Sequence, residues 1–173
     1  MSARVGSATI PATNHAEVLG VRMSTEGQGA VARLGSLIIG IDHVGVAVRD
    51  LDVAIAFYVD NFGMQVRHQE TNEDQGVNEA MLGVGDSVTE LQLLAPLAPE
   101  SPIGRFIERT GEGIQQMAYR VTDVEAASDV LRSAGLRMLY DTPRRGTAGA
   151  RINFVHPKDC GGVLVELIER VEP

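Results

Sequence analysis

From about Ile38 onward, the pattern of hydrophobic and polar positions along the chain occurs twice. The stretches DHVGVAVRDLDVAIAFY and QQMAYRVTDVEAASDVL each begin with an apolar run, reach an aspartate, and continue with apolar residues every three or four positions. The offset between the copies is constant, since 116 − 43 = 73 and 123 − 50 = 73. Each copy therefore predicts a β-strand followed by an α-helix, with Asp50 and Asp123 as N-caps whose carboxylates accept helix N–H groups.

The second part of each copy predicts further strands. TELQLLAP aligns with VLVELIER at nearly the same offset, which pairs Gln92 with Glu166 (166 − 92 = 74). Both runs are short, rich in leucine and β-branched residues, and bounded by turn-forming residues, as strands usually are. Between the copies, PESPIGRFIERTGEG predicts a helix near 101–110, with Ser101 as its N-cap and Pro102 at its first helical position.

The repeat also divides the chain. It predicts an α+β domain over 39–173, built from two tandem modules of one strand, one helix and further strands, about 39–98 and 112–170. Modules this short need each other to complete a hydrophobic core. Residues 1–38 lie outside the repeat and are rich in Ala, Gly, Ser and Thr, so we expect an N-terminal extension that is flexible or draped over the surface.

Composition restricts the class of protein. The formal net charge of −8 over 173 residues argues against nucleic acid as a partner, because phosphate binding needs a basic surface. No run of eighteen apolar residues occurs, and the N-terminus lacks the pattern of a secretory signal, so we expect a protein that does not span a membrane. A single cysteine, Cys160, excludes an internal disulfide framework and suits a reducing cytoplasm.

The two adjacent glutamines in GEGIQQMAYRV, Gln115 and Gln116, are the first residues that suggest a functional site. Side chains alternate faces along a strand, so one glutamine should face the interior and the other away from it. The repeat selects Gln116, because it matches His43, and leaves Gln115 on the opposite face. His43, Gln92, Gln116 and Glu166 would then converge, and each would cost about 1–3 kcal/mol if it were buried without a partner. A divalent metal ion or a bound substrate would supply the partners, although His43 by itself could equally be a hydrogen-bonded core histidine.

Several stretches resemble the methylmalonyl-CoA epimerase family of the vicinal oxygen chelate superfamily. The similar stretches are DHVGVAVRDLDVAIAFY, DQGVNEAML, LQLLAP, SPIGRFIERTGEGI and RRGTAGARINFVHPKDCGGVLVELIE. The resemblance covers about residues 40–170, and FVHPKDCGGVLVEL is its most specific part. It implies a glyoxalase-like open barrel of two tandem βαβββ modules, and by analogy a homodimer.

The resemblance also implies a metal site. Carried over residue by residue, the ligands of a divalent cation such as Co²⁺ fall on His43, Gln92, Gln116 and Glu166. The family has a histidine where this chain has Gln116. An amide oxygen is a poorer donor than imidazole for cobalt, nickel or zinc but is acceptable for harder ions, so we expect a metal that is weaker bound, different or absent.

For the reaction, the resemblance implies an isomerase that epimerises methylmalonyl-CoA or a related 2-substituted malonyl thioester. The substrate partner would be an acyl-CoA. The two bases that exchange the proton at C2 fall on Glu79, in DQGVNEAML, and on Glu166. In a metal-assisted reaction, the cation would stabilise the enolate formed between the two proton transfers.

Other functions stay open at this point. The replacement by Gln116 favours a diverged vicinal oxygen chelate enzyme, metal-free or with an altered metal, that acts on another substrate in secondary metabolism. A non-catalytic small-molecule-binding protein is a further alternative, but sequestration would need no pair of bases. Glu90, on the same strand as Gln92, could replace a missing ligand, although a salt bridge at the rim is the simpler expectation.

Overall fold

The computed structural model describes residues 33–171, so most of the predicted extension lies outside the described residues. Residues 33–37 form one helical turn, in which Leu34 and Leu37 pack against a buried cluster of the second module. The packed part of the chain therefore begins a few residues before the predicted boundary at 38.

The chain folds into two βαβββ modules, as predicted. The first comprises β1 (Ile38–Ala47), α2 (Leu51–Phe62), β2 (Gln65–Asn72), β3 (Val77–Gly83) and β4 (Glu90–Pro96). After α3 (Pro102–Thr110), the second comprises β5 (Gly113–Val121), α4 (Val124–Ser133), β6 (Arg144–Arg145), β7 (Arg151–Val155) and β8 (Leu164–Glu169), with short 3₁₀ turns η2 (Thr147–Gly149) and η3 (Pro157–Asp159).

The predicted helix caps are present. The side chains of Asp50, Ser101 and Asp123 accept hydrogen bonds from the backbone N–H groups three residues later, at 2.9–3.1 Å. Gly63 ends α2 in the left-handed conformation, with φ of 65°, where a side chain would be strained. Local sequence signals therefore set the helix ends.

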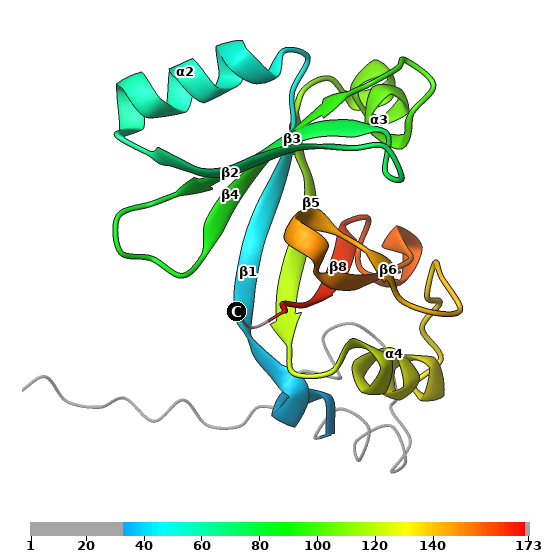
Figure 1. The fold of residues 1–173 in the computed structure, drawn as a ribbon. Helices are drawn as coiled ribbons and strands as arrows, with labels where there is room; N and C mark the ends of the chain where they lie inside the picture. Colours follow the sequence, from blue (N-terminus) through cyan, green and yellow to red (C-terminus); the bar gives the residue numbers. More distant parts are fainter. Residues whose placement is uncertain (1–32, 172–173) are drawn as a thin grey trace, which may run out of the picture.

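All eight strands form one sheet, in the order β2-β3-β4-β1-β5-β8-β7-β6. The modules meet edge to edge where β1 pairs antiparallel with β5, while β1 with β4 and β5 with β8 are parallel pairs. Figure 1 shows the sheet curling into an open barrel, with α2 and α4 beside different halves of it. Each half thus presents its inner face to the same central space.

Alternation along the strands separates an apolar outer side, packed under the helices, from an inner side that carries the buried polar residues among apolar ones. On β4, Leu93 packs in the core cluster under α2, whereas Gln92 and Leu94 line the interior of the curl. On β8, Leu167 packs with α4 residues, whereas Glu166 lines the interior. The helices thus bury the outer face of each half, and the inner face is left for the site.

Three register shifts interrupt the pairing of β1 with β5, and two of them are bulges at equivalent positions of the repeat. Asp42 is the extra residue between the paired residues Ile41 and His43, and Gln115 is the extra residue between Ile114 and Gln116 (115 − 42 = 73). A bulge re-aims the side chain next to it. The prediction that Gln115 faces away from the interior is therefore wrong, because Gln115 and Gln116 both line the cavity.

Candidate active site

The inner face of the curled sheet encloses a cavity of about 170 Å³. Four predicted site residues line it, each from a different strand: Glu79 from β3, Gln92 from β4, Gln116 from β5 and Glu166 from β8. All four side chains are buried. His43, the remaining predicted residue, is also buried and lies against this group, with its Nε2 3.3 Å from Glu166 Oε2.

The two carboxylates lie at the ends of a chain of hydrogen bonds. Gln92 Nε2 donates to Glu79 Oε2 at 2.7 Å, and its Oε1 accepts from Gln116 Nε2 at 3.1 Å. Gln116 Nε2 also donates to Glu166 Oε2 at 2.6 Å and lies 3.4 Å from His43 Nε2. The amide nitrogen of Gln116 therefore occupies the point on which the other three predicted metal ligands converge.

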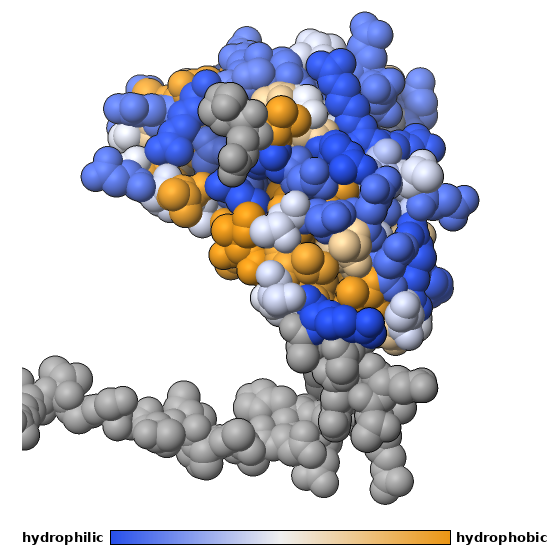
Figure 2. Space-filling model, turned by 60° about the horizontal axis from the view of Figure 1, so that its bottom comes forward, coloured by the Kyte–Doolittle hydropathy of each residue, from blue (hydrophilic) through white to orange (hydrophobic). Residues whose placement is uncertain are grey.

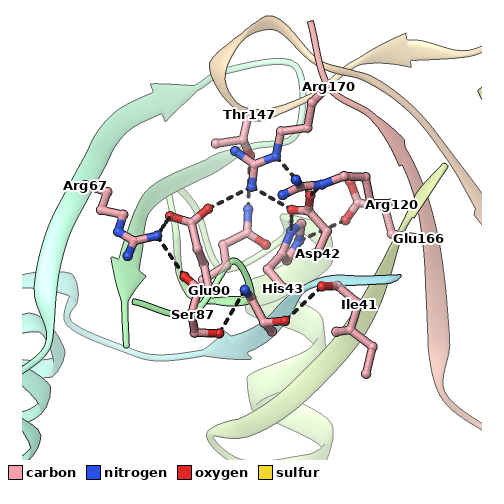
Figure 3. Close-up of polar contacts among 12 residues, drawn as sticks. Ile41, Asp42, His43, Arg67, Ser87, Glu90, Arg120, Thr147, Glu166 and Arg170 are labelled. Carbon is pink, nitrogen blue, oxygen red and sulfur yellow. Dashed lines mark hydrogen bonds and ion pairs between the residues drawn. The ribbon is translucent and has the colours of Figure 1, made fainter. Parts of the chain in front are cut away.

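Asp42 holds the imidazole of His43 at Nδ1, the ring nitrogen that does not face Gln116 (Figure 3). The His43 Nδ1–H donates to Asp42 Oδ1 at 2.9 Å, which leaves Nε2 directed at the group around Gln116. Asp42 is fully buried and also accepts hydrogen bonds from Arg120 Nε at 2.6 Å and from Arg170 at 2.6 and 3.0 Å. Burial alone would lower the pKa of His43, but the hydrogen bonds to Asp42 and Glu166 outweigh it and raise that pKa to about 9.

Sequence reasoning missed Asp42. The available signal was a second polar residue beside His43 in an otherwise apolar strand, in the same place as Gln115, the first glutamine of the later copy. Glu90 behaves as expected of a salt-bridge residue, since its carboxylate lies 2.8 Å from Arg170 and 3.6 Å from Arg67 and does not line the cavity (Figure 3). It is buried rather than at a solvated rim.

Thr147, in η2, is a second residue that sequence reasoning missed. Its hydroxyl donates to Glu79 Oε1 at 3.0 Å and accepts from Gln92 Nε2 at 3.1 Å. The next residue, Ala148, has a φ of 53°, a conformation unfavourable for a residue with a side chain. A threonine in a glycine- and alanine-rich loop is common, so no sequence signal marked it.

The environment of Glu79 sets a pH dependence for any reaction in which it accepts a proton. Burial raises the pKa of Glu79 to about 7, against the opposing effect of hydrogen bonds from Thr147 and Asn72. Below that pH the carboxyl is protonated and cannot act as a base. We therefore expect kcat/KM for proton abstraction to rise about tenfold per pH unit up to about 7 and to level off above it, in a rate profile measured from pH 5 to 9. A midpoint near the ordinary value for glutamate would contradict this assignment.

The donor set fits a cation of the harder kind. The described residues 33–171 contain no cluster of three or more His, Cys, Asp or Glu side chains suited to a metal ion. One imidazole, one carboxylate and two amide groups nevertheless converge, since His43 Nε2, Gln92 Oε1 and Glu166 Oε2 lie 2.6–3.4 Å from Gln116 Nε2. With the Gln116 amide turned so that its oxygen faces this point, the four side chains make a site with one nitrogen and three oxygen donors.

Comparison with known proteins agrees with this architecture. Residues 42–154 match the Glyoxalase/Bleomycin resistance protein/Dioxygenase superfamily. Human mitochondrial methylmalonyl-CoA epimerase is 37% identical over 140 residues, which make up 80% of this chain and 76% of that protein. The crystal structure of methylmalonyl-CoA epimerase from Mycobacterium tuberculosis is 55% identical and superposes with a TM-score of 0.77, covering 79% of this chain and 91% of that one.

A further solved structure bears on ligands. It is a methylmalonyl-CoA epimerase in complex with methylmalonyl-CoA and NH4+, 46% identical to this chain, with a TM-score of 0.75 and coverage of 79% of this chain and 96% of that one. The curled sheet of two βαβββ modules, with a cavity on its inner face, thus defines a glyoxalase-superfamily protein. Within that superfamily, the chain belongs to the methylmalonyl-CoA epimerase family.

Proposed function

We propose that this protein is an isomerase that epimerises methylmalonyl-CoA, or a related 2-substituted malonyl thioester, by proton abstraction at C2. The observation that carries the proposal is the pair of buried carboxylates, Glu79 and Glu166, at the two ends of one hydrogen-bonded chain in one cavity. Epimerisation needs two groups that exchange a proton with the same carbon. A protein that only sequestered a small molecule would gain nothing from burying two carboxylates.

The proton transfers balance between the two carboxyl groups. In one direction the ionised Glu79 takes the C2 proton, and Glu166 delivers the proton that it shares with His43 Nε2, 3.3 Å from its Oε2, to the opposite face of the resulting enolate. The roles reverse in the other direction. A pKa near 7 suits Glu79 to this task, because it can then accept and release a proton at similar cost at neutral pH.

The charge that develops on the thioester oxygen must be stabilised. His43, Gln92, Gln116 and Glu166 would hold a divalent cation, which when bound supplies Lewis-acid stabilisation of the enolate. Without a cation, amide N–H groups in the cavity supply a weaker stabilisation. In the free protein the two N–H bonds of the Gln116 amide point to Gln92 Oε1 and Glu166 Oε2, so in this second mode the substrate oxygen replaces one of these acceptors.

Replacing Gln116 by histidine tests the metal site. We expect Gln116→His to tighten Co²⁺ binding by at least about tenfold, because an imidazole nitrogen is a better cobalt ligand than an amide oxygen. Isothermal titration of chelator-treated protein with CoCl₂ measures the affinity without any turnover. Gln65→His, at an exposed position of β2, is the matched control. Equal cobalt affinity in all three proteins would rule out Gln116 as a ligand position.

The rest of an acyl-CoA would lie outside the small cavity. Gln75 and Tyr140 line both the cavity and a neighbouring hollow, which also contains Arg144 and Arg145. Both arginines are exposed. Their charge supports a contact with the phosphates of the coenzyme, so the proposal extends to coenzyme A thioesters rather than free acids.

We also propose that the protein is a cytoplasmic homodimer. None of the helices within residues 33–171 is long and apolar enough to cross a membrane.

Figure 2 shows a face on which apolar side chains gather among polar ones. The exposed side chains of Ile39, Val88 and Val171 line a groove on the surface, and exposed apolar area of this kind supports pairing. Light scattering on the purified protein should give the mass of two chains.

The first test of function is deuterium uptake at C2 of methylmalonyl-CoA in heavy water, followed by NMR with chelator-treated protein, with and without cobalt. Uptake with cobalt alone would establish the metal-assisted reaction, and uptake without it would assign stabilisation to the amides. Absence of uptake in both cases would overturn the epimerase proposal. It would favour a diverged enzyme acting on another substrate or a non-catalytic binding protein.

A further inference from the structure

Gln115 is half-buried, and its side-chain oxygen Oε1 is buried without a hydrogen-bond partner. It is the extra residue of the bulge in β5, and it lines the same cavity as Gln92, Gln116 and Glu166. Within the described residues, its Oε1 is the buried side-chain atom that has no hydrogen bond. A buried acceptor without a donor lowers the stability of the fold, because it has lost its hydrogen bonds to water and gained none in return. Such groups in native proteins usually have a functional cause.

The equivalent bulge in the first module shows what a structural bulge residue does in this fold. There Asp42 is fully paired, with His43, Arg120 and Arg170 as donors, and it orients the imidazole of the adjacent His43. Gln115 has no such role, since its oxygen contacts neither Gln116 nor any other donor. The second bulge brings a polar side chain to the cavity wall and leaves its buried acceptor without a donor, and a turn of the amide towards the cavity presents this oxygen to a ligand.

The chemistry of the substrate identifies the complementary group. An acceptor needs an N–H or O–H donor. The malonyl part of a malonyl thioester offers only acceptors at neutral pH, namely a carboxylate and a thioester carbonyl. The pantetheine arm carries amide N–H groups, of which the first lies two methylene groups from the sulfur. The reacting acyl group and this amide therefore lie close enough to enter the same cavity region together.

We propose that Gln115 Oε1 accepts a hydrogen bond from the first amide N–H of the pantetheine arm, and that Gln115 thereby selects pantetheine thioesters over simple alkyl thioesters. This inference rests on the proposed function, because it takes the substrate class from it. Apolar cavity residues such as Ile103 and Leu164 provide packing surface for the two methylene groups. Gln115 is thus a specificity-determining residue, separate from the two bases.

The test pairs one variant with two substrates. Gln115→Leu removes the amide at nearly constant volume. The first substrate is the methylmalonyl thioester of N-acetylcysteamine, which keeps the amide, and the second is its analogue in which a methylene replaces the N–H. We expect Gln115→Leu to weaken binding and lower kcat/KM by about tenfold for the first substrate, and to change both by less than about twofold for the second. Equal effects on the two substrates, or none on either, would overturn the proposal.

Binding and turnover are read separately, so that this proposal and the proposed function can fail independently. Isothermal titration with the racemic thioesters gives affinities whether or not the protein epimerises them, because a racemic mixture undergoes no net reaction. If the unmodified protein shows no deuterium uptake yet prefers the amide thioester by about tenfold, and Gln115→Leu abolishes that preference, the proposed reaction fails and the role of Gln115 holds. Failure of the unmodified protein to prefer the amide thioester would overturn the role of Gln115.

Thermal unfolding distinguishes recognition from structural support. Because Gln115 Oε1 makes no hydrogen bond in the free protein, Gln115→Leu should leave the Tm unchanged or raise it. A fall of several degrees would mean that the side chain supports the bulge, and would overturn the assignment. Gln65→Leu, at an exposed position of β2, is the control for the same chemical change away from the cavity.

Discussion

Replacement of Glu79 by glutamine is expected to lower the rate of deuterium exchange at C2 by about 10²–10⁴-fold for the epimer of methylmalonyl-CoA whose C2 proton faces Glu79, the usual contribution of a positioned general base. The amide cannot accept the C2 proton, although it has nearly the shape of the carboxylate. The fold should persist, because the side chain remains large enough to fill its buried place between Gln92 and Thr147. The rate is measured by NMR in heavy water, at saturating and at low substrate concentration.

Two further measurements define what the loss means. Cobalt affinity should stay unchanged in Glu79→Gln, since Glu79 is not among the four groups proposed to hold the cation. Glu108→Gln, at an exposed position of α3, should retain full exchange and serves as the control. If Glu79→Gln loses metal binding together with exchange, Glu79 supports the site structurally and is not one of its bases.

Asp42→Ala is expected to have the largest effect on stability, lowering the free energy of unfolding by about 3–5 kcal/mol. The change removes a fully buried carboxylate and leaves the partly buried Arg120 and Arg170 facing a cavity, with Glu90 as the one remaining carboxylate on Arg170. It also removes the acceptor that orients His43, so cobalt affinity should fall by about 10–100-fold. Urea denaturation and titration calorimetry measure the two effects.

The contribution of Asp42 should also depend on pH. Burial alone would raise the pKa of Asp42, but hydrogen bonds from His43, Arg170 and Arg120 hold it well below its usual range. The stabilisation is therefore present above the pKa of the unfolded chain and is lost as pH falls towards the folded value. Asp129→Ala, which breaks an exposed pair with Arg132, should cost at most about 1 kcal/mol. Equal costs for the two variants would mean that the network around Asp42 contributes little.

Local sequence pattern was enough for most of the architecture. The offset of 73 residues identified the two modules, and Asp50, Ser101 and Asp123 marked the helix starts that the structure has. These features depend on contacts within a few residues, which a sequence displays directly. The same repeat indicated that His43, Gln92, Gln116 and Glu166 converge, because equivalent positions of two like modules face one shared interior.

The prediction that Gln115 faces away from the interior is wrong for a physical reason that can be named. Alternation of faces holds only while each residue of a strand pairs with one residue of its neighbour, and the bulge between β5 and β1 breaks that count. Whether a strand contains a bulge depends on the register with its partner. A pattern of polar and apolar residues along one strand does not contain that information.

The sequence of this protein thus determined by itself the two modules, their helix ends and the polar residues that would meet between them, since each follows from periodicity or from neighbours in the chain. The partners of those polar residues depended on tertiary structure. Arg170 reaches Asp42 from 128 positions away, and Thr147 reaches Glu79 across 68. Such contacts arise only once the curled sheet has joined β1 to β5, because closing the sheet brings together side chains that no local pattern links.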